Sequence, residues 1–216
     1  IKKIQSPKLF YYKKENAERA AARNFGVQKS CGNYVNFLDS DDLLYSHHLS
    51  TALKLIFRVN MPELFYLNSD IRNSEMKFLR NATIIKDEFN QQLLKGNILS
   101  CNGVFIKREI AIKHPFNENR QLSGTEDWEL WLRLSSRYKL HYSNEVTSSF
   151  INHNDRSVLN ADEDQLKKRT ELLIHYLSQD SVFKEKYGSG IYRIKAHMLS
   201  YTALHLSLNN KSSKAL

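Results

Sequence analysis

The sequence has few cysteines and no long apolar run. Its 216 residues include two cysteines, Cys31 and Cys101, too few for a disulfide framework and too isolated for a zinc site. This fits a reducing compartment, so we expect the cytoplasm. No apolar segment reaches the roughly 20 residues needed to cross a bilayer, and no signal-peptide pattern opens the sequence. The first residue is Ile1 and not Met, which predicts that upstream sequence is missing.

Positive charge is in excess but is scattered along the chain. The 32 Lys and Arg residues exceed the 23 Asp and Glu residues, which gives a net charge of +9. Such a charge predicts an anionic partner. The sequence shows no zinc finger, helix-turn-helix pattern or RNA-binding aromatic signature, so we expect no nucleic-acid partner. Phosphorylated substrates and anionic lipid headgroups account for the charge as easily.

Length and composition are those of an ordinary globular protein. Hydrophobic residues make up 41% and charged residues 25% of the chain, which excludes a disordered or fibrous protein. The length suits one large domain, or a domain with a small appendage.

A cluster of carboxylates follows a short apolar run in YVNFLDSDDLL, residues 34–44. Asp39, Asp41 and Asp42 lie within four residues of one another, and such carboxylates repel unless a cation or hydrogen-bond donors neutralise them. Oxygen ligands on a sharp turn suit Mg²⁺ or Mn²⁺, which often takes its other ligands from substrate phosphates. The alternative is helix capping in a solvated turn.

The pattern of apolar residues predicts an α/β chain. Strand candidate 9–12, helix 17–27 and buried strand 34–38 have the spacing of a parallel sheet. Further expected elements are helix 49–57, strand 64–67, helix 89–95 closed by Gly96, strand 103–106 and helix 108–113.

A second acidic pair, Glu126 and Asp127, lies in QLSGTEDWELWLRLSSRY. Ser123 and Glu126 have the spacing of a capping box, and Thr125 is an alternative cap; both carboxylates are therefore expected in the first turn of a helix. Alone they read as a pair that complements the helix dipole. Together with the acidic cluster they suggest a general base beside a metal site. Trp128 either packs in the core or stacks on a sugar, whereas Trp131 is expected in the core.

Five segments in order, ENAERAAARNFG, GNYVNFLDSDD, PFNEN, GTEDWELWLRL and FINHNDRS, together resemble a family 2 glycosyltransferase of the inverting GT-A type. The resemblance covers residues 9–158. It implies a Rossmann-like mixed sheet flanked by helices, with the catalytic domain in residues 1–160 and a helical C-terminal extension in residues 161–216.

The resemblance also implies a role for each matching residue. Asp127 would be the general base, with Glu126 helping to orient the acceptor, and Asp41 would bind Mg²⁺ or Mn²⁺ together with His153. The donor nucleotide would contact Arg23, Asn24, Asp39 and Ser40. The acceptor would contact Asn102, Gly103 and Trp128.

The expected reaction moves a sugar from a nucleoside-diphosphate donor to a hydroxyl of a carbohydrate or lipid-linked acceptor, as in bacterial surface polysaccharide synthesis. Two departures from the family bear on it. The first strand, helix and second strand, which hold the nucleotide base, are absent, and residues 1–6 resemble the tail of the next helix. Ile151 stands where relatives often have Arg, two residues before His153.

Residues 161–216 predict amphipathic helices, separated by a turn at residues 188–190. Lys167, Lys168 and Arg169 cluster on one face of the first helix. This tail either packs on the domain or a partner, or contacts a membrane surface from the cytoplasmic side.

Two other functions fit parts of the sequence. A haloacid-dehalogenase-like phosphohydrolase also places Asp-x-Asp at a strand end, but Leu43 stands where that class has Thr or Val. A non-catalytic sugar-binding or partner-binding remnant would account for the missing front end.

Overall fold

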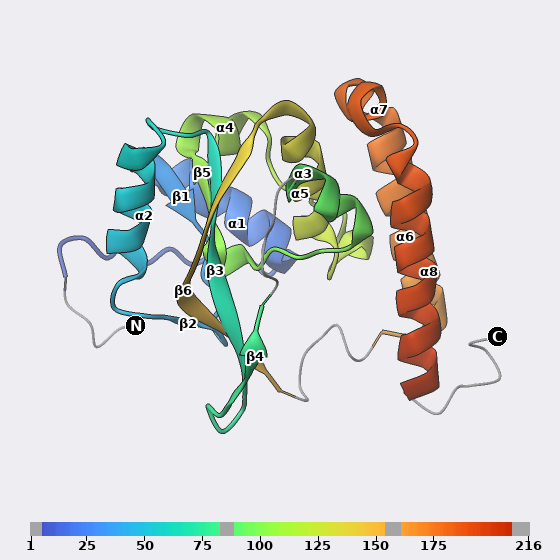
Figure 1. Ribbon diagram of the computed structural model, residues 1–216, viewed down its shortest axis with the longest axis horizontal. Helices are drawn as coiled ribbons and strands as arrows, with labels where there is room; N and C mark the ends of the chain where they lie inside the picture. Colours follow the sequence, from blue (N-terminus) through green and yellow to red (C-terminus); the bar gives the residue numbers. More distant parts are fainter. Residues whose placement is uncertain (1–5, 83–88, 154–160, 209–216) are drawn as a thin grey trace.

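The computed structural model describes residues 6–82, 89–153 and 161–208. A twisted sheet lies at its centre, with helices on both faces and a group of C-terminal helices beyond one of them (Figure 1). The expected mixed sheet flanked by helices, with a helical C-terminal part, is therefore confirmed. None of the helices in the described ranges combines the length and apolarity that a membrane crossing requires.

The sheet has six strands, and its pairing is mostly antiparallel. Its order is β1 (Tyr34–Asn36), β5 (Val104–Lys107), β3 (Leu64–Asn73), β6 (Leu140–Asn152) and β2 (Leu43–Leu44), with β4 (Phe78–Asn81) beside β3. Among the strand pairs in the described part of the chain, only β3 and β6 pair in parallel. The parallel sheet predicted from the spacing of residues 9–12, 17–27 and 34–38 is wrong, because residues 9–12 form no strand and β1 pairs with β5 in antiparallel orientation.

The helices match the apolar periodicity. They are α1 (Glu18–Lys29), α2 (His48–Arg58), α3 (Phe89–Gln92), α4 (Arg108–Lys113), α5 (Glu126–Arg137), α6 (Glu163–Gln179), α7 (Ser181–Tyr187) and α8 (Gly190–Leu208). A 3₁₀ turn, Leu93–Lys95, extends α3 up to Gly96, whose φ is 155°. The predicted helices are confirmed.

Two local predictions are wrong. Residues 9–12 form no strand, and their apolar side chains are exposed because no neighbouring strand covers them. The capping box at α5 is absent: the alternative cap, Thr125, is the N-cap, and it makes no side-chain cap bond. The Glu126 carboxylate instead accepts a hydrogen bond from the Gly124 amide at 2.6 Å. Glu126 is turned toward α1, as described below, so it does not reach back to Ser123.

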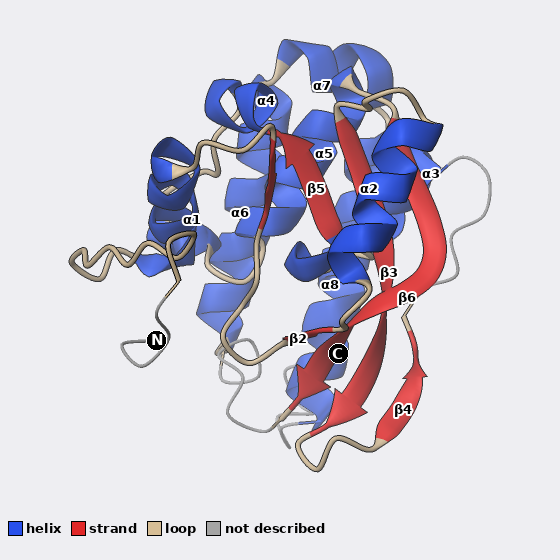
Figure 2. Ribbon diagram, turned by 90° about the vertical axis from the view of Figure 1, so that its left-hand side faces the viewer, coloured by secondary structure: helices blue, strands red, loops and turns tan. Residues whose placement is uncertain are grey.

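Alternate residues of β3 face two separate cores. Phe65 and Leu67 pack with α2 and Phe105 on one face, whereas Leu64 and Tyr66 face the larger core on the other. Figure 2 shows α2 in front of the sheet and α5, α6 and α8 behind it. The larger core joins Trp128 and Trp131 of α5 to residues of the C-terminal helices, Leu173, Leu177, Phe183 and Ile194. The C-terminal helices thus share the core of the sheet.

Gly103 is held where no side chain fits. A Cβ atom there would overlap the Leu67 carbonyl oxygen and the Tyr66 ring. We expect Gly103→Ala to lower the free energy of unfolding by about 1–3 kcal/mol or more. Gly26→Ala is the matched control: nothing lies within 4 Å of its Cβ position, and alanine should stabilise α1 by about 0.5–1 kcal/mol. Urea denaturation measures both, and equal effects would contradict this account.

Candidate active site

The two acidic segments of the sequence face one cleft. This cavity of about 520 Å³ lies between α1, the corner after β1, residues 97–101 and the first turn of α5. Its polar lining residues include Arg19, Arg23, Asp39, Asp42, Asn97, Ser100, Glu126, Asp127 and Tyr201. Residues far apart in the chain therefore meet at a single site.

The acidic corner is fastened to β6. The Asp42 amide donates to the Asp39 carbonyl oxygen at 3.1 Å, which closes the turn. The Asp42 carboxylate accepts hydrogen bonds from the Ile151 amide at 3.1 Å and from Asn102 Nδ2 at 3.4 Å. Asp42 thereby fixes the position of the preceding carboxylates relative to the sheet.

Arg23 links the two acidic segments. Its Nη2 donates to Asp39 Oδ1 at 2.8 Å, and its Nη1 donates to Glu126 Oε1 at 3.0 Å. Burial by itself would lower the pKa of Arg23, but negative charge on Cys101, which is ionised only at the high pH where arginine titrates, and on Asp39 and Asp127 raises that pKa above the ordinary arginine value. Arg23 therefore stays charged and holds the corner and α5 together.

Glu126 is engaged in that link. Its side chain is 3% exposed, and its two oxygens accept from Arg23 and from the Gly124 amide. Arg19 Nε lies 3.8 Å from the same carboxylate. The carboxylate borders the cleft, but its hydrogen bonds are to the protein.

Asp127 presents a carboxylate at the wall of the cleft. Its Oδ1 accepts from the Trp128 amide at 2.7 Å, and Cys101 Sγ lies 3.9 Å from its Oδ2. Burial, and next the charge of Glu126, raise the pKa of Asp127 to about 6, although Arg23 opposes the shift. A carboxylate with such a pKa can accept a proton near neutral pH.

Asp41 and His153 meet at the outer side of the corner. Asp41 Oδ2 lies 3.1 Å from His153 Nε2, and the two side chains are 41% and 25% exposed. Within the described ranges no group of three His, Cys, Asp or Glu side chains is arranged to hold a metal. An open carboxylate–imidazole pair fits Mn²⁺ or Mg²⁺ that takes its other ligands from water and phosphate. Asp41 itself lines neither of the cavities at this site.

A second cavity of about 540 Å³ adjoins the first. It runs between α1 and the end of β1 and shares Arg19, Arg23 and Asp39 with the cleft. Ser40 also lines it. The predicted donor-binding residues Arg23, Asp39 and Ser40 therefore border one continuous region.

Asn24 faces away from both cavities. Its Nδ2 donates to the Phe116 carbonyl oxygen at 2.9 Å and to Glu118 at 2.8 Å, and its Oδ1 accepts from the Phe116 amide at 2.9 Å. The structure corrects its predicted nucleotide contact: successive positions on a helix point in different directions, and Asn24 ties α1 to the loop before α5.

The three predicted acceptor residues are buried behind the cleft. Asn102 is 0% and Trp128 2% exposed, and the Trp128 indole nitrogen donates to the Leu93 carbonyl oxygen. Gly103 packs against β3. The predicted acceptor contacts of Asn102, Gly103 and Trp128 are therefore corrected to core roles.

Other residues take their place on the cleft wall. These are Asn97–Cys101, which come just before the predicted segment, and Tyr201 from α8. Arg19 was also missed, although it stands one turn before Arg23 on the same helix and could have been found from that spacing. Tyr201 lies far along the chain, and no motif marks it.

The comparisons with known proteins show the family to which the chain belongs. The profile described as glycosyltransferase like family 2 matches residues 1–201, so the chain belongs to this family and the resemblance seen in the sequence is confirmed. An uncharacterized glycosyltransferase of Rickettsia bellii is 32% identical over 134 residues, which cover 60% of this chain and 19% of the relative. A chondroitin synthase of Pasteurella multocida is 22% identical over 182 residues, 84% of this chain and 19% of that protein.

The chain is similar in structure to S. aureus TarS in complex with UDP-GlcNAc, with 12% identity and a TM-score of 0.48. The match covers 89% of this chain and 68% of the TarS chain. The chain spans 19% of the length of the Rickettsia bellii relative and 35% of a second one from Rickettsia felis. The family match gives no support to the phosphohydrolase alternative.

Replacing Arg23 should expose its linking role. In Arg23→Gln the buried Glu126 carboxylate loses its cationic partner, and we expect the free energy of unfolding to fall by about 3–5 kcal/mol. Arg19→Gln, one turn earlier on α1 and also near Glu126, is the control and should cost less than about 1 kcal/mol because its side chain is 34% exposed. Chemical denaturation measures both values. Similar losses in the two variants would contradict the assignment.

Proposed function

We propose that the chain carries the catalytic site of a metal-dependent inverting glycosyltransferase, which moves a sugar from a nucleoside-diphosphate donor to an acceptor hydroxyl. One observation carries the proposal. Asp127, with its raised pKa, and the acidic corner after β1 border the same cleft, and Arg23 joins the corner to Glu126, the residue before Asp127. A proton acceptor and an anion-stabilising side of a site are the two parts that such a transfer needs.

The donor is assigned to the region between α1 and the acidic corner. Arg23, Asp39 and Ser40 line its cavity. Asp41 and His153 would hold Mg²⁺ or Mn²⁺, and the bound cation would neutralise the charge that develops on the diphosphate. Arg19 and Arg23 add fixed positive charge where the two cavities join.

The acceptor is assigned to the side of the cleft that Asp127 and Asn97–Cys101 line. Asp127 takes the proton of the acceptor hydroxyl while that oxygen forms a bond to the anomeric carbon of the donor. The bond from that carbon to the diphosphate breaks at the same time, and the electron pair leaves with the diphosphate. Because attack comes from the face opposite the leaving group, the configuration at the carbon inverts.

Two relatives of the chain favour a carbohydrate acceptor. Among them are a chondroitin synthase and a hyaluronan synthase of Pasteurella multocida, 22% and 23% identical to this chain. We propose a sugar hydroxyl of a growing glycan, free or lipid-linked, as the group that attacks. The reaction would be part of polysaccharide or glycoconjugate synthesis.

The pKa of Asp127 sets the expected pH dependence. The base works only when it is deprotonated, so kcat/KM should rise about tenfold per pH unit below pH 6 and level off above it. Asp127→Asn should lower kcat by about 10²- to 10⁴-fold, and the rise of kcat/KM below pH 6 should disappear. Steady-state transfer assays across pH 4.5–8.5 (about four units, chosen to bracket that pKa) provide the measurement.

Asp164→Asn is the matched control for the base assignment. Asp164 also lies in the first turn of a helix, α6, but it is exposed to solvent. The Asp164→Asn variant should transfer sugar at the rate of the parent protein. An Asp127→Asn variant that transfers sugar at the parent rate would remove Asp127 from the mechanism.

Metal dependence is tested by donor binding. Isothermal titration of a panel of nucleoside diphosphates should show binding that Mn²⁺ strengthens at least tenfold, about 1.4 kcal/mol. Asp41→Ala and His153→Ala should each reduce that enhancement, since they remove the proposed ligands. His175→Ala, at an exposed position of α6, is the control. Unchanged enhancement in Asp41→Ala would exclude this metal site.

A further inference from the structure

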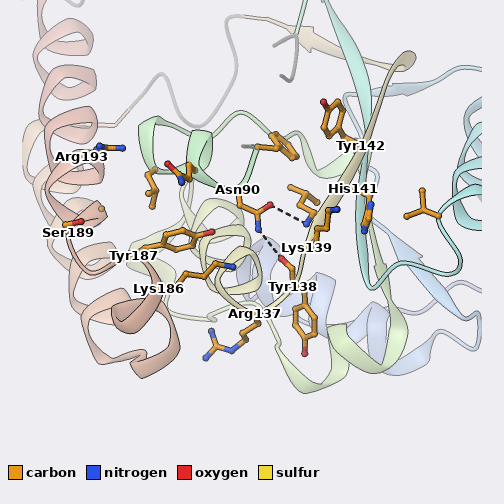
Figure 3. Close-up of a pocket in the computed structure, with 16 residues that line it drawn as sticks. Asn90, Arg137, Tyr138, Lys139, His141, Tyr142, Lys186, Tyr187, Ser189 and Arg193 are labelled. Carbon is orange, nitrogen blue, oxygen red and sulfur yellow. Dashed lines mark hydrogen bonds between the residues drawn. The ribbon is translucent and has the colours of Figure 1, made fainter. Parts of the chain in front are cut away.

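A third pocket lies between the sheet and the C-terminal helices. It has a volume of about 870 Å³, within the size range of small-ligand sites. One wall comes from the turn between α5 and β6, and the other from α7 and the start of α8 (Figure 3). It shares no lining residue with the catalytic cleft.

The pocket and the cleft are separate sites on the same sheet. Tyr142, near the start of β6, lines the pocket, whereas Phe150 of the same strand lines the cleft. A strand rises about 3.3 Å per residue, which puts these two residues roughly 25 Å apart along β6. On the nearer side the two sites are three residues apart, since Leu94 lines the pocket and Asn97 lines the cleft.

The lining of the pocket is basic. Its ionisable residues with a basic side chain are Arg137, Lys139, His141, Lys186 and Arg193, and among the residues that the structure describes no Asp or Glu lines it. The catalytic cleft, by contrast, is lined by both cations and carboxylates. A low pKa of His141, caused by burial and then by the charge of Lys139, agrees with a positive field.

Part of this charge is already balanced. Arg137 pairs with Asp180 at 2.8 Å, and Lys186 donates to the Ser135 carbonyl oxygen at 3.2 Å. Lys139 and Arg193 are exposed, and across the described part of the chain neither has an ion-pair partner. These two cations are the ones available to a ligand.

The available cations stand on opposite walls. Figure 3 shows Lys139 and His141 on the β6 side and Arg193 and Lys186 on the side of the C-terminal helices. A single phosphate cannot contact charges that are spread in this way. A chain with anionic groups at intervals can, because each group meets a different cation.

The aromatic residues argue against nucleic acid. Single-stranded nucleic acids use exposed rings on which bases stack. Tyr187 is 8% exposed and donates its hydroxyl to the Ser135 carbonyl oxygen, and the Tyr138 hydroxyl bonds His114 at 3.2 Å. Tyr138 and Tyr187 therefore serve the packing of the pocket, and the half-buried Tyr142 packs on Phe89 with ring centroids 5.5 Å apart.

We propose that this pocket binds an acidic glycan, a saccharide chain that carries carboxylate or phosphate groups, at a distance from its reacting end. The choice of a glycan over other polyanions rests on the proposed function. The pocket would hold the chain while its terminal hydroxyl lies in the catalytic cleft, and the C-terminal helices would complete the acceptor site by supplying Arg193.

Charge reversal on both walls tests the proposal. The probes are fluorescent oligomers of glucuronic acid and of glycerol phosphate, which separate carboxylate from phosphate recognition, a neutral maltooligosaccharide, and a single-stranded oligodeoxynucleotide. Anisotropy titration at low salt should show binding of at least one acidic oligomer and none of the neutral one. In K139E/R193E the affinity should fall at least tenfold.

The matched control carries the same change of charge elsewhere. Lys54 and Arg58 are exposed on α2, and neither lines any of the three cavities. K54E/R58E should alter the affinity less than twofold. Thermal unfolding checks that both variants fold. Equal losses in the two variants, no binding of either acidic oligomer, or tighter binding of the oligodeoxynucleotide would each overturn the proposal.

The outcome is separable from that of the proposed function. Nucleoside diphosphates should bind K139E/R193E as they bind the parent, because the pocket and the donor region share no residue. A chain that binds acidic oligomers in this pocket but no nucleoside diphosphate would lose its proposed transfer reaction and keep the pocket. A chain that binds nucleoside diphosphates but no acidic oligomer would lose the proposed glycan pocket and keep the proposed transfer reaction.

Discussion

The charge on Arg23 holds the candidate active site together. One guanidinium donates to Asp39 after β1 and to Glu126 at the start of α5, which lie far apart in the chain. Burying a cation costs free energy unless carboxylates surround it, and burying those carboxylates costs as much without the cation. Each group is therefore tolerated only because the others are present. Asp127, beside this cluster, owes its raised pKa to the same burial and to the neighbouring Glu126.

The sheet supports this cluster through its two cores. β3 alternates its side chains between α2 on one face and the larger core on the other, so both faces resist movement. Gly103 allows β3 and the segment before β5 to approach closely, and Asp42 joins the acidic corner to β6. The C-terminal helices share the larger core with α5 and also bring Tyr201 to the cleft. They are thus part of the site as well as of the fold.

Several features could be predicted because their cause is local. Apolar residues three and four apart predicted α2 and α5. The cluster of three carboxylates predicted a sharp turn with a functional role after β1. Other predictions failed where a distant contact decides the outcome. The strand at residues 9–12 lacks a partner, the direction of β1 depends on β5, and Asn24 turns to Phe116 instead of the cavity. Trp128, left open between sugar stacking and packing, is buried against Leu93.

The sequence by itself determined which residue types are available, the helical periodicity and the family to which the chain belongs, because these are properties of neighbouring residues and of motifs. Only the tertiary structure decided which of the carboxylates open to the cleft, which of them serve Arg23, and that basic side chains scattered over residues 137–193 gather around one pocket. The reason is that charge and burial act through space: a side chain acquires its environment from the elements that pack against it, and chain order alone does not specify them.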